Sequence, residues 1–212
     1  MNIELSNAGK RFNREWIFRK ADFVFTAANS YAITGPNGSG KSTLLQSIGG
    51  ILQLSEGEIE YAISNPAKDG ISKQLPMEKA YQYISFCAPY LEVVEEMTLL
   101  EFLQFHVQFK PFIADVSIYQ VIEMIDLQKA TDKQIRNFSS GMKQRLRLAQ
   151  AIFSDTSVLL LDEPCTNLDE SGIQLYHTLI KNYCQSRLVI VSSNDEVEYR
   201  FCKERIDIQQ YK

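Results

Sequence analysis

The segment YAITGPNGSGKSTLL, residues 31–45, places a glycine-rich turn between a short apolar run and a helical pattern. Residues 31–34 predict a buried strand bounded by turn formers, and the apolar spacing from Lys41 onward predicts a helix closed by Gly49 and Gly50. A strand, a glycine loop and a helix N-terminus in this order bind anions, because the glycines let consecutive N–H groups point inward and the helix end adds partial positive charge. The chain is therefore expected to fold around a phosphate site at the end of a buried strand.

The loop fits the nucleotide-binding frame G-x-x-x-x-G-K-S. A chance match in a chain of this length has a probability of roughly one percent, and the strand before the loop and the helix after it lower that further. In this frame Lys41 reaches the β- and γ-phosphates, and the hydroxyl of Ser42 binds Mg²⁺. The loop alone does not separate a kinase, a GTPase, a motor or a pump. The residues predicted to bind the nucleotide here are Gly35, Pro36, Asn37, Gly38, Ser39, Gly40, Lys41, Ser42 and Thr43.

Composition narrows the class of protein. A chain of 212 residues can fold as one domain with a lobe or as two small domains. Its apolar content of 45% is ordinary for a soluble globular protein, and its net charge of −4 argues against non-specific nucleic-acid binding. The N-terminus has no apolar segment of the kind that indicates a secretory signal. No apolar run approaches the ~20 residues that cross a bilayer. The four cysteines contain no C-x-x-C pair, which favours reduced thiols over a metal site.

The periodicity of the rest of the chain predicts an α/β fold. Alternating residues over 2–27 predict an antiparallel β-region, and helical spacing runs through 98–153. Buried apolar strands that alternate with helices indicate a mainly parallel sheet covered on both faces, with the helical block inserted between its two halves. The other predicted elements are strands at 57–63, 81–89, 158–161 and 187–193, a helix at 170–185, a surface loop at 64–76 and a further alternating run at 203–211.

Two carboxylates, Asp162 and Glu163, follow the apolar run at 158–161. Ligands of open α/β sheets bind beyond the carboxyl ends of the strands, so both side chains are expected at the phosphate site. One carboxylate would serve Mg²⁺, and the next could polarise an attacking water. The alternative is an acidic pair that solvates a strand end and starts the next helix. The phosphate loop in the same chain favours the catalytic interpretation.

The segment NFSSGMKQRLRLAQAIF, residues 137–153, decides the family that the sequence resembles. The chain resembles the ATP-binding cassette family, the ATPase subunits of ABC transporters. FSSGM looks like the signature motif of that family, GPNGSGKST like its Walker A motif, VLLLDEP like its Walker B motif, and TNLD, which contains Asp169, like its D-loop. The resemblance runs from about Phe12 to Asp195. Phe12 lies at the usual distance before the phosphate loop for the aromatic residue that stacks on adenine, although it could equally be a strand core residue.

The resemblance implies a fold, a mechanism and partners. It implies a P-loop ABC-type cassette with an N-terminal antiparallel β-region, in which 1–88 and 154–212 form the nucleotide-binding core and 89–153 the helical lobe. In the family two cassettes pair head to tail around two ATP molecules. The partner is a second copy or another ABC ATPase subunit, and an integral membrane permease holds the pair at the cytoplasmic face of the cell membrane; nucleic acid is not expected as a partner. The implied roles are contact with the ATP of the partner chain for Ser139, Ser140 and Gly141, Mg²⁺ binding for Ser42 and Asp162, and general-base catalysis for Glu163.

Two positions depart from the family pattern. The family usually has a histidine after the strand that matches LVIVSS, where its ring touches the γ-phosphate, and this chain has Asn194. It also has a glutamine after the strand that matches YISF, which binds Mg²⁺ and senses the membrane partner, and this chain has Pro89. These departures concern turnover and coupling rather than ATP binding. His106 and His177 lie in predicted helices and do not fit the register of the missing histidine, whereas Asn194 is retained as a catalytic candidate, and Tyr90 or Glu92 could replace part of the glutamine's function.

Three functions therefore remain open from the sequence. The first is the ATPase subunit of an ABC transporter, which hydrolyses ATP and closes as a dimer to power transport. The second is a soluble ABC-type ATPase that acts on ribosomes, DNA or another protein machine. The third is a regulatory nucleotide switch with slow hydrolysis, which the missing histidine and glutamine favour and Glu163 opposes. The transported substrate cannot be inferred, since in this family the membrane subunit selects it. The aromatic residues at helical spacing in the inserted block, interpreted as lobe core or as a contact with the membrane subunit, are Phe102, Phe105, Phe109 and Phe112.

Overall fold

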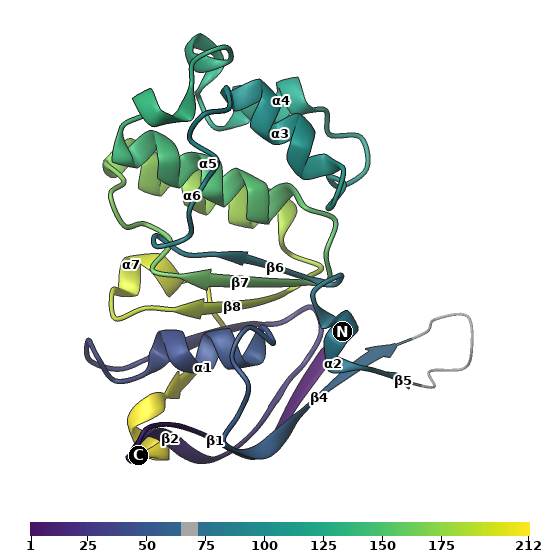
Figure 1. The fold of residues 1–212 in the computed structure, drawn as a ribbon, viewed down its shortest axis with the longest axis vertical. Helices are drawn as coiled ribbons and strands as arrows, with labels where there is room; N and C mark the ends of the chain where they lie inside the picture. Colours follow the sequence, from purple (N-terminus) through teal and green to yellow (C-terminus); the bar gives the residue numbers. More distant parts are fainter. Residues whose placement is uncertain (65–71) are drawn as a thin grey trace. The chain divides into compact units, whose positions relative to one another are not determined.

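A computed structural model describes residues 1–64 and 72–212 of the chain (Figure 1). The chain packs as two compact units. The core unit comprises Met1–Phe86, Thr156–Asp162 and Ser186–Lys212, and the helical unit comprises Cys87–Asp155 and Glu163–Gln185. Residues 163–185 thus pack with the helical unit, although the sequence analysis assigned them to the nucleotide-binding core; the division into domains stays a prediction.

The core unit contains the predicted antiparallel sheet. Its strands β1 (Asn2–Phe12), β2 (Glu15–Phe25), β4 (Glu56–Ser64) and β5 (Ser72–Leu75) lie in the order β2-β1-β4-β5. Apolar side chains of alternate residues, such as Ile3 and Leu5, are buried on one face of this sheet. The prediction of a loop at 64–76 was wrong for 72–75, and the rest of that loop, 65–71, lies outside the described residues. The sequence SKQL did not predict this strand, because it is short and polar, as edge strands often are.

The core unit also contains a sheet of five strands, and the predicted nucleotide site lies at the carboxyl ends of β3 and β7 in this sheet. Strands β6 (Ile84–Cys87), β7 (Val158–Asp162), β8 (Leu188–Ser192), β3 (Ser30–Thr34) and β9 (Glu204–Asp207) lie in the order β6-β7-β8-β3-β9. The pairs β7–β8, β8–β3 and β3–β9 are parallel. Every residue of β7 and β8 is buried, which explains why both sequences are apolar without alternation. The run at 203–211 is a strand only to Asp207, and η3 (Ile208–Tyr211) continues it as a 3₁₀ helix.

Helix α1 (Lys41–Ile48) lies between the two sheets of the core unit (Figure 1). Its apolar face joins a single core with residues of both sheets, because Leu44, Leu45 and Ile48 are buried in the cluster that also contains Ile3 and Ile33. The hydroxyl of Tyr61 on β4 donates to the carbonyl of Ile48 at 2.9 Å and thereby satisfies the helix end. The antiparallel sheet therefore supports the helix that begins at the phosphate loop. Two short helices complete the unit, α2 (Met77–Ala80) and α7 (Glu196–Tyr199).

The helical unit contains α3 (Leu99–Val107), α4 (Ile118–Met124), α5 (Ser140–Phe153) and α6 (Glu170–Tyr183), with 3₁₀ turns η1 (Gln128–Ala130) and η2 (Ile135–Asn137). The predicted helical block is therefore three α-helices joined by turns. Capping boxes start α3 at Thr98 and α4 at Ser117. Among the described residues, no helix is both long and apolar enough to span a membrane.

The aromatic residues of the helical unit divide between its core and its surface. Phe102 is buried, and Phe112 packs against the buried Phe153 with ring centroids 6.3 Å apart. Phe105 and Phe109 are exposed and contact each other edge to face at 5.0 Å. The interpretation as lobe core is therefore confirmed for Phe102, whereas contact with a membrane subunit stays a prediction. These aromatic residues have a core half and an exposed half.

His106 is a packed core residue of the helical unit. The amide of Gln150 on α5 donates to its Nδ1 at 3.1 Å, so the neutral ring donates from Nε2 to Ser154 Oγ at 2.9 Å. Ser154 in turn donates to the carbonyl of Gln150 at 2.6 Å. Burial, together with the charge of Lys110, lowers the pKa of His106 from 6.5 to about 4. The ring therefore joins α3 to α5 in its uncharged form.

This low pKa predicts acid sensitivity of the helical unit. Above about pH 6.5 His106 is neutral in the folded and unfolded chain, whereas between 6.5 and 4 only the unfolded chain takes up the proton. The free energy of unfolding is therefore expected to fall as the pH drops through this range. Urea unfolding of wild type and His106→Gln at pH 7.5 and 5 measures the effect, and the variant should lose less stability on acidification. His177→Gln removes the other histidine as a control; a smaller acid loss in that variant alone would contradict the assignment.

Candidate nucleotide-binding site

The phosphate loop, residues 35–40, connects β3 to α1 in the core unit. Gly40 is the N-cap of α1 and has a left-handed backbone with φ +94°. A Cβ atom at this position would lie 2.3 Å from Cγ2 of Ile17 on β2. Glycine is therefore required at residue 40 both by the backbone and by the close approach of the first hairpin. Ile17 could not be identified from the sequence, because nothing in the loop shows which strand packs beneath it.

The side chains of the loop present polar hydrogens to its interior. Lys41 is 4% exposed, and its ammonium donates to the carbonyls of Gly35 at 3.0 Å and Pro36 at 3.2 Å. The hydroxyl of Ser39 is buried and has no hydrogen-bond partner among the described residues. A buried hydroxyl without a partner is costly unless another molecule satisfies it. A buried cation and a buried hydroxyl in a glycine loop at a helix N-terminus suit a phosphate.

Ser42 and Asp162 form the second part of the site. Ser42 is the second residue of α1, and its hydroxyl donates to Oδ1 of Asp162 at 3.0 Å. Asp162 ends β7 and is 1% exposed. Two oxygen atoms at this distance beside a phosphate loop fit Mg²⁺, which prefers hard oxygen ligands and takes the rest from phosphate and water. The described residues contain no group of three or more His, Cys, Asp or Glu side chains that could hold a metal alone.

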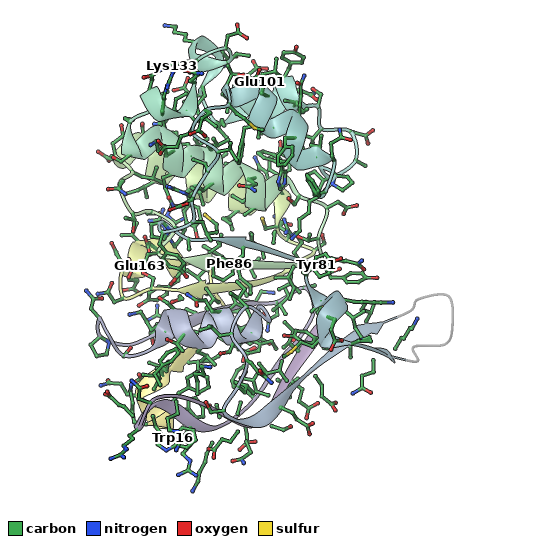
Figure 2. The ribbon with its side chains drawn as sticks, viewed as in Figure 1. Trp16, Tyr81, Phe86, Glu101, Lys133 and Glu163 are labelled. Atoms are coloured by element: carbon green, nitrogen blue, oxygen red, sulfur yellow. The ribbon has the colours of Figure 1, made fainter. Side chains whose placement is uncertain are left out.

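Glu163 directly follows the carboxyl end of β7 (Figure 2). Its backbone is left-handed, with φ +42°, a conformation that is unfavourable for glutamate and is often found at functional sites. The N–H of Thr166 donates to the Glu163 carbonyl at 3.2 Å, which closes a turn. The amide of Gln144, buried on α5, donates to the carbonyl of Pro164 at 2.8 Å and fixes the same turn. Gln144 is a supporting residue that the sequence analysis missed.

Asn194, at the position of the family's histidine, lies beside the phosphate loop. Its Nδ2 donates to Oδ1 of Asn37 at 3.1 Å. Asp195, its neighbour, uses its carboxylate to cap α7 by accepting from the N–H of Val197 at 2.9 Å. Pro89, the other departure, belongs to the helical unit, in a turn where the N–H of Leu91 donates to the Ala88 carbonyl at 3.2 Å.

The predicted signature and D-loop residues share a groove of about 450 Å³ in the helical unit. Ser139 caps α5 by accepting from the N–H of Met142 at 3.2 Å. A Cβ atom at Gly141 would lie 3.0 Å from the carbonyl oxygen of Asn167, so the glycine allows the two segments to approach. Asp169 caps α6, and the N–H of Gly172, followed by Ser171 and Arg145, lowers the pKa of its carboxyl. The groove is lined by Ser139, Ser140, Gly141, Arg145, Asn167 and Asp169, among others.

Phe12 ends β1 and is 46% exposed, so it is not a strand core residue. The ammonium of Lys10 lies over its ring, 5.1 Å from the centroid. The hairpin that carries Phe12 reaches the phosphate loop through Ile17. An exposed ring on this hairpin is compatible with the predicted stacking on adenine.

The family model described as "ABC transporter" matches residues 18–166. The chain belongs to the ABC transporter family. As a member it is an ATP-binding and ATP-hydrolysing subunit. It is 29% identical to the uncharacterized ABC transporter ATP-binding protein YhcH of Bacillus subtilis over 98% of this chain and 67% of that protein. It is 28% identical to the cytochrome c biogenesis ATP-binding export protein CcmA of Pasteurella multocida over 92% of this chain and 89% of that protein.

Solved ABC cassettes have the same fold. A dimeric ATP-binding cassette in a post-hydrolysis state, bound to ADP and inorganic phosphate, superposes with a TM-score of 0.78 and covers 97% of this chain and 94% of its own. At 22% identity this likeness shows the fold alone. The predicted α/β cassette with a P-loop and an N-terminal antiparallel region is thus confirmed.

The contact between Gly40 and Ile17 predicts a specific difference between two loop variants. Gly38 also has a left-handed backbone, with φ +75°, but a Cβ atom there would meet nothing within 4 Å. Gly38→Ala should therefore lower the free energy of unfolding by about 1–2 kcal/mol, the cost of a left-handed backbone at a residue with a Cβ atom. Gly40→Ala adds a clash that is expected to cost about 1–3 kcal/mol more.

Chemical unfolding of both variants measures this difference. Ile17→Ala should recover part of the loss in the Gly40→Ala background, because it removes the atom that clashes. Equal losses for the two glycine variants, or no recovery, would show that Ile17 does not constrain the loop.

Proposed function

We propose that the chain binds ATP with Mg²⁺ at the phosphate loop and hydrolyses it with Glu163 as general base, to power transport through a separate membrane subunit. The observation that carries the proposal is the hydrogen bond between Ser42 and Asp162 beside the buried Lys41. This arrangement joins the loop to the end of β7, where Glu163 follows in the chain.

Binding would use groups that the loop already holds inward. The ammonium of Lys41 would exchange its bonds to the Gly35 and Pro36 carbonyls for phosphate oxygens, and Ser39 would donate its hydroxyl. Ser42 and Asp162 would hold Mg²⁺, which when bound neutralises charge on the β- and γ-phosphates. Phe12 would stack on adenine from the neighbouring hairpin.

Hydrolysis needs a base that takes a proton from the attacking water. Glu163 would accept this proton as the water oxygen bonds to the γ-phosphorus and the bond to ADP breaks. Its left-handed backbone sets the direction of the side chain at the strand end. Asn194 would contribute a neutral N–H donor near the terminal phosphate in place of a histidine.

The signature groove supports the proposal that the active form contains two chains. Ser139, Ser140 and Gly141 stand at the N-terminus of α5, whose 14 residues give a helix dipole suited to a phosphate. In the family arrangement these groups serve the nucleotide of the second copy or of another ABC ATPase subunit. Asp169, beside them in the same groove, would lie at that contact.

A second groove supports a membrane partner. It has a volume of about 650 Å³ in the helical unit and is lined by Tyr90, Leu91, Val94, Phe102 and Arg147, among others. The exposed pair Phe105 and Phe109 lies on the helix that supplies Phe102. The same groove also contains the carboxylates of Glu92, Glu95 and Glu96. A surface that combines these charges with exposed aromatic rings would suit docking to an integral membrane permease, which would place the chain peripherally at the cytoplasmic face of the cell membrane.

Lys41→Ala is expected to abolish nucleotide binding. The ammonium is the buried charge of the loop, and its removal leaves the phosphates without their main counter-charge. Binding of a fluorescent ATP analogue measures the effect, with circular dichroism to confirm folding. Lys73→Ala, on the edge strand β5, is the matched control and should bind as wild type. Unchanged affinity in folded Lys41→Ala protein would contradict the proposed site.

Glu163→Gln is expected to trap ATP and to produce a dimer. Without the base, hydrolysis should slow by about 10²–10⁴-fold, and ATP that binds only the closed pair would stabilise that pair. Size-exclusion chromatography with ATP and Mg²⁺ measures the change. Glu58→Gln, an exposed carboxylate on β4, provides the control for loss of charge. A monomeric profile with ATP demonstrably bound would argue against the two-chain form.

A further inference from the structure

Two amide side chains meet beyond the carboxyl ends of β3 and β8, which are neighbours in the parallel sheet. Asn37 belongs to the phosphate loop and Asn194 to the loop that follows β8, and both are exposed. The Nδ2 of Asn194 donates to Oδ1 of Asn37 at 3.1 Å. In the described part of the chain this is the one hydrogen bond of the Asn194 amide, so its second N–H and its oxygen stay available.

This hydrogen bond is not needed to shape the loop after β8. The backbone N–H of Ser193 donates to the carbonyl of Ile33 at 3.1 Å, which anchors the loop to β3. The hydroxyl of Ser193 accepts from the N–H of Asp195 at 2.9 Å, and the Asp195 carboxylate accepts from Val197. The backbone around Asn194 is thus fixed by other groups. The contact with Asn37 can only affect where the Asn194 side chain points.

The orientation of an asparagine amide has a chemical consequence near a phosphate. Its NH₂ group attracts a negatively charged oxygen, whereas its carbonyl oxygen repels one, and the two ends have nearly the same shape. In the hydrogen bond with Asn37 it is the NH₂ group of Asn194, and not its carbonyl oxygen, that faces the phosphate loop. The first N–H goes to Asn37, and the second, on the same nitrogen, remains available to an oxygen bound beside the loop.

We propose that Asn37 is a positioning residue that holds the Asn194 amide with its free N–H toward the terminal phosphate of ATP. The inference rests on the proposed function, since it requires ATP at the phosphate loop. It assigns Asn37 a task that its place in the loop does not show, namely to orient a side chain 157 residues away in the sequence. ADP lacks the terminal phosphate, so the pair would distinguish ATP from ADP.

The affinities of non-hydrolysable AMP-PNP and of ADP, both with Mg²⁺, test this inference without requiring turnover. Asn37→Ala should weaken AMP-PNP about three- to tenfold more than it weakens ADP, the effect of losing the order of one side chain. Asn194→Ala should weaken AMP-PNP at least as much. In the double variant the preference for AMP-PNP over ADP should fall no further than in Asn194→Ala, because Asn37 acts on the terminal phosphate only through Asn194.

Two further variants separate positioning from general damage. Asn194→Asp keeps the shape but presents a charged acceptor, so it should weaken AMP-PNP more than Asn194→Ala does. Asn182→Ala removes an exposed amide from α6 and should change neither affinity.

Equal weakening of AMP-PNP and ADP by Asn37→Ala, or losses that multiply in the double variant, would overturn the inference while leaving the proposed function intact. If wild type binds neither nucleotide, or if Lys41→Ala binds both as wild type does, the proposed function fails and the inference fails with it. A selective loss for AMP-PNP that is absent in the Asn194→Ala background supports it.

Discussion

The parallel register of β7, β8 and β3 is the constraint on which the site depends. Asp162 lies opposite Ser192, and Ser192 lies opposite Ile33, so three strands end at the same level. The end of β7 supplies Asp162, and the segments after β8 and β3 supply Asn194 and the phosphate loop. The hydrogen bond from Ser42 to Asp162 then fixes the start of α1 to the end of β7. Side chains from three distant parts of the sequence meet here because the strands run in one direction.

The sequence predicted the parts of this site whose chemistry is local. The phosphate loop needs only neighbouring glycines, one lysine and one serine, so it could be located from a short segment. The two fully buried strands could be located because apolar residues without alternation require cover on both faces. By contrast, the pairing of Asn37 with Asn194 and the packing of Ile17 under Gly40 depend on which segments become neighbours. No local pattern encodes such contacts, and the short polar strand β5 escaped for a similar reason, since its partner β4 determines its conformation.

Asn194 stands where the resemblance predicts a histidine, and the two side chains offer different chemistry at the strand ends. An imidazole can donate, accept and carry charge near neutral pH, whereas an amide donates and accepts without titrating. An amide also has two nearly equivalent orientations, so a neighbour must select one. In the structure the Asn194 amide donates to Oδ1 of Asn37 in the phosphate loop. Asn194 is therefore held by a contact within the core unit at the place where the resemblance predicts a histidine.

Two isoleucines from segments far apart in the chain pack against the phosphate loop. Ile17 packs under Gly40, and Ile208 lies close to both Gly35 and Gly40. During synthesis the loop leaves the ribosome long before residue 208. Its contact with Ile208 therefore cannot form until the end of the core unit has been made. Contacts over such separations form late, because closing the long intervening chain is entropically costly. Nucleotide binding would consequently report completion of the whole core unit, and a nascent chain that had exposed only the loop would not yet retain ATP.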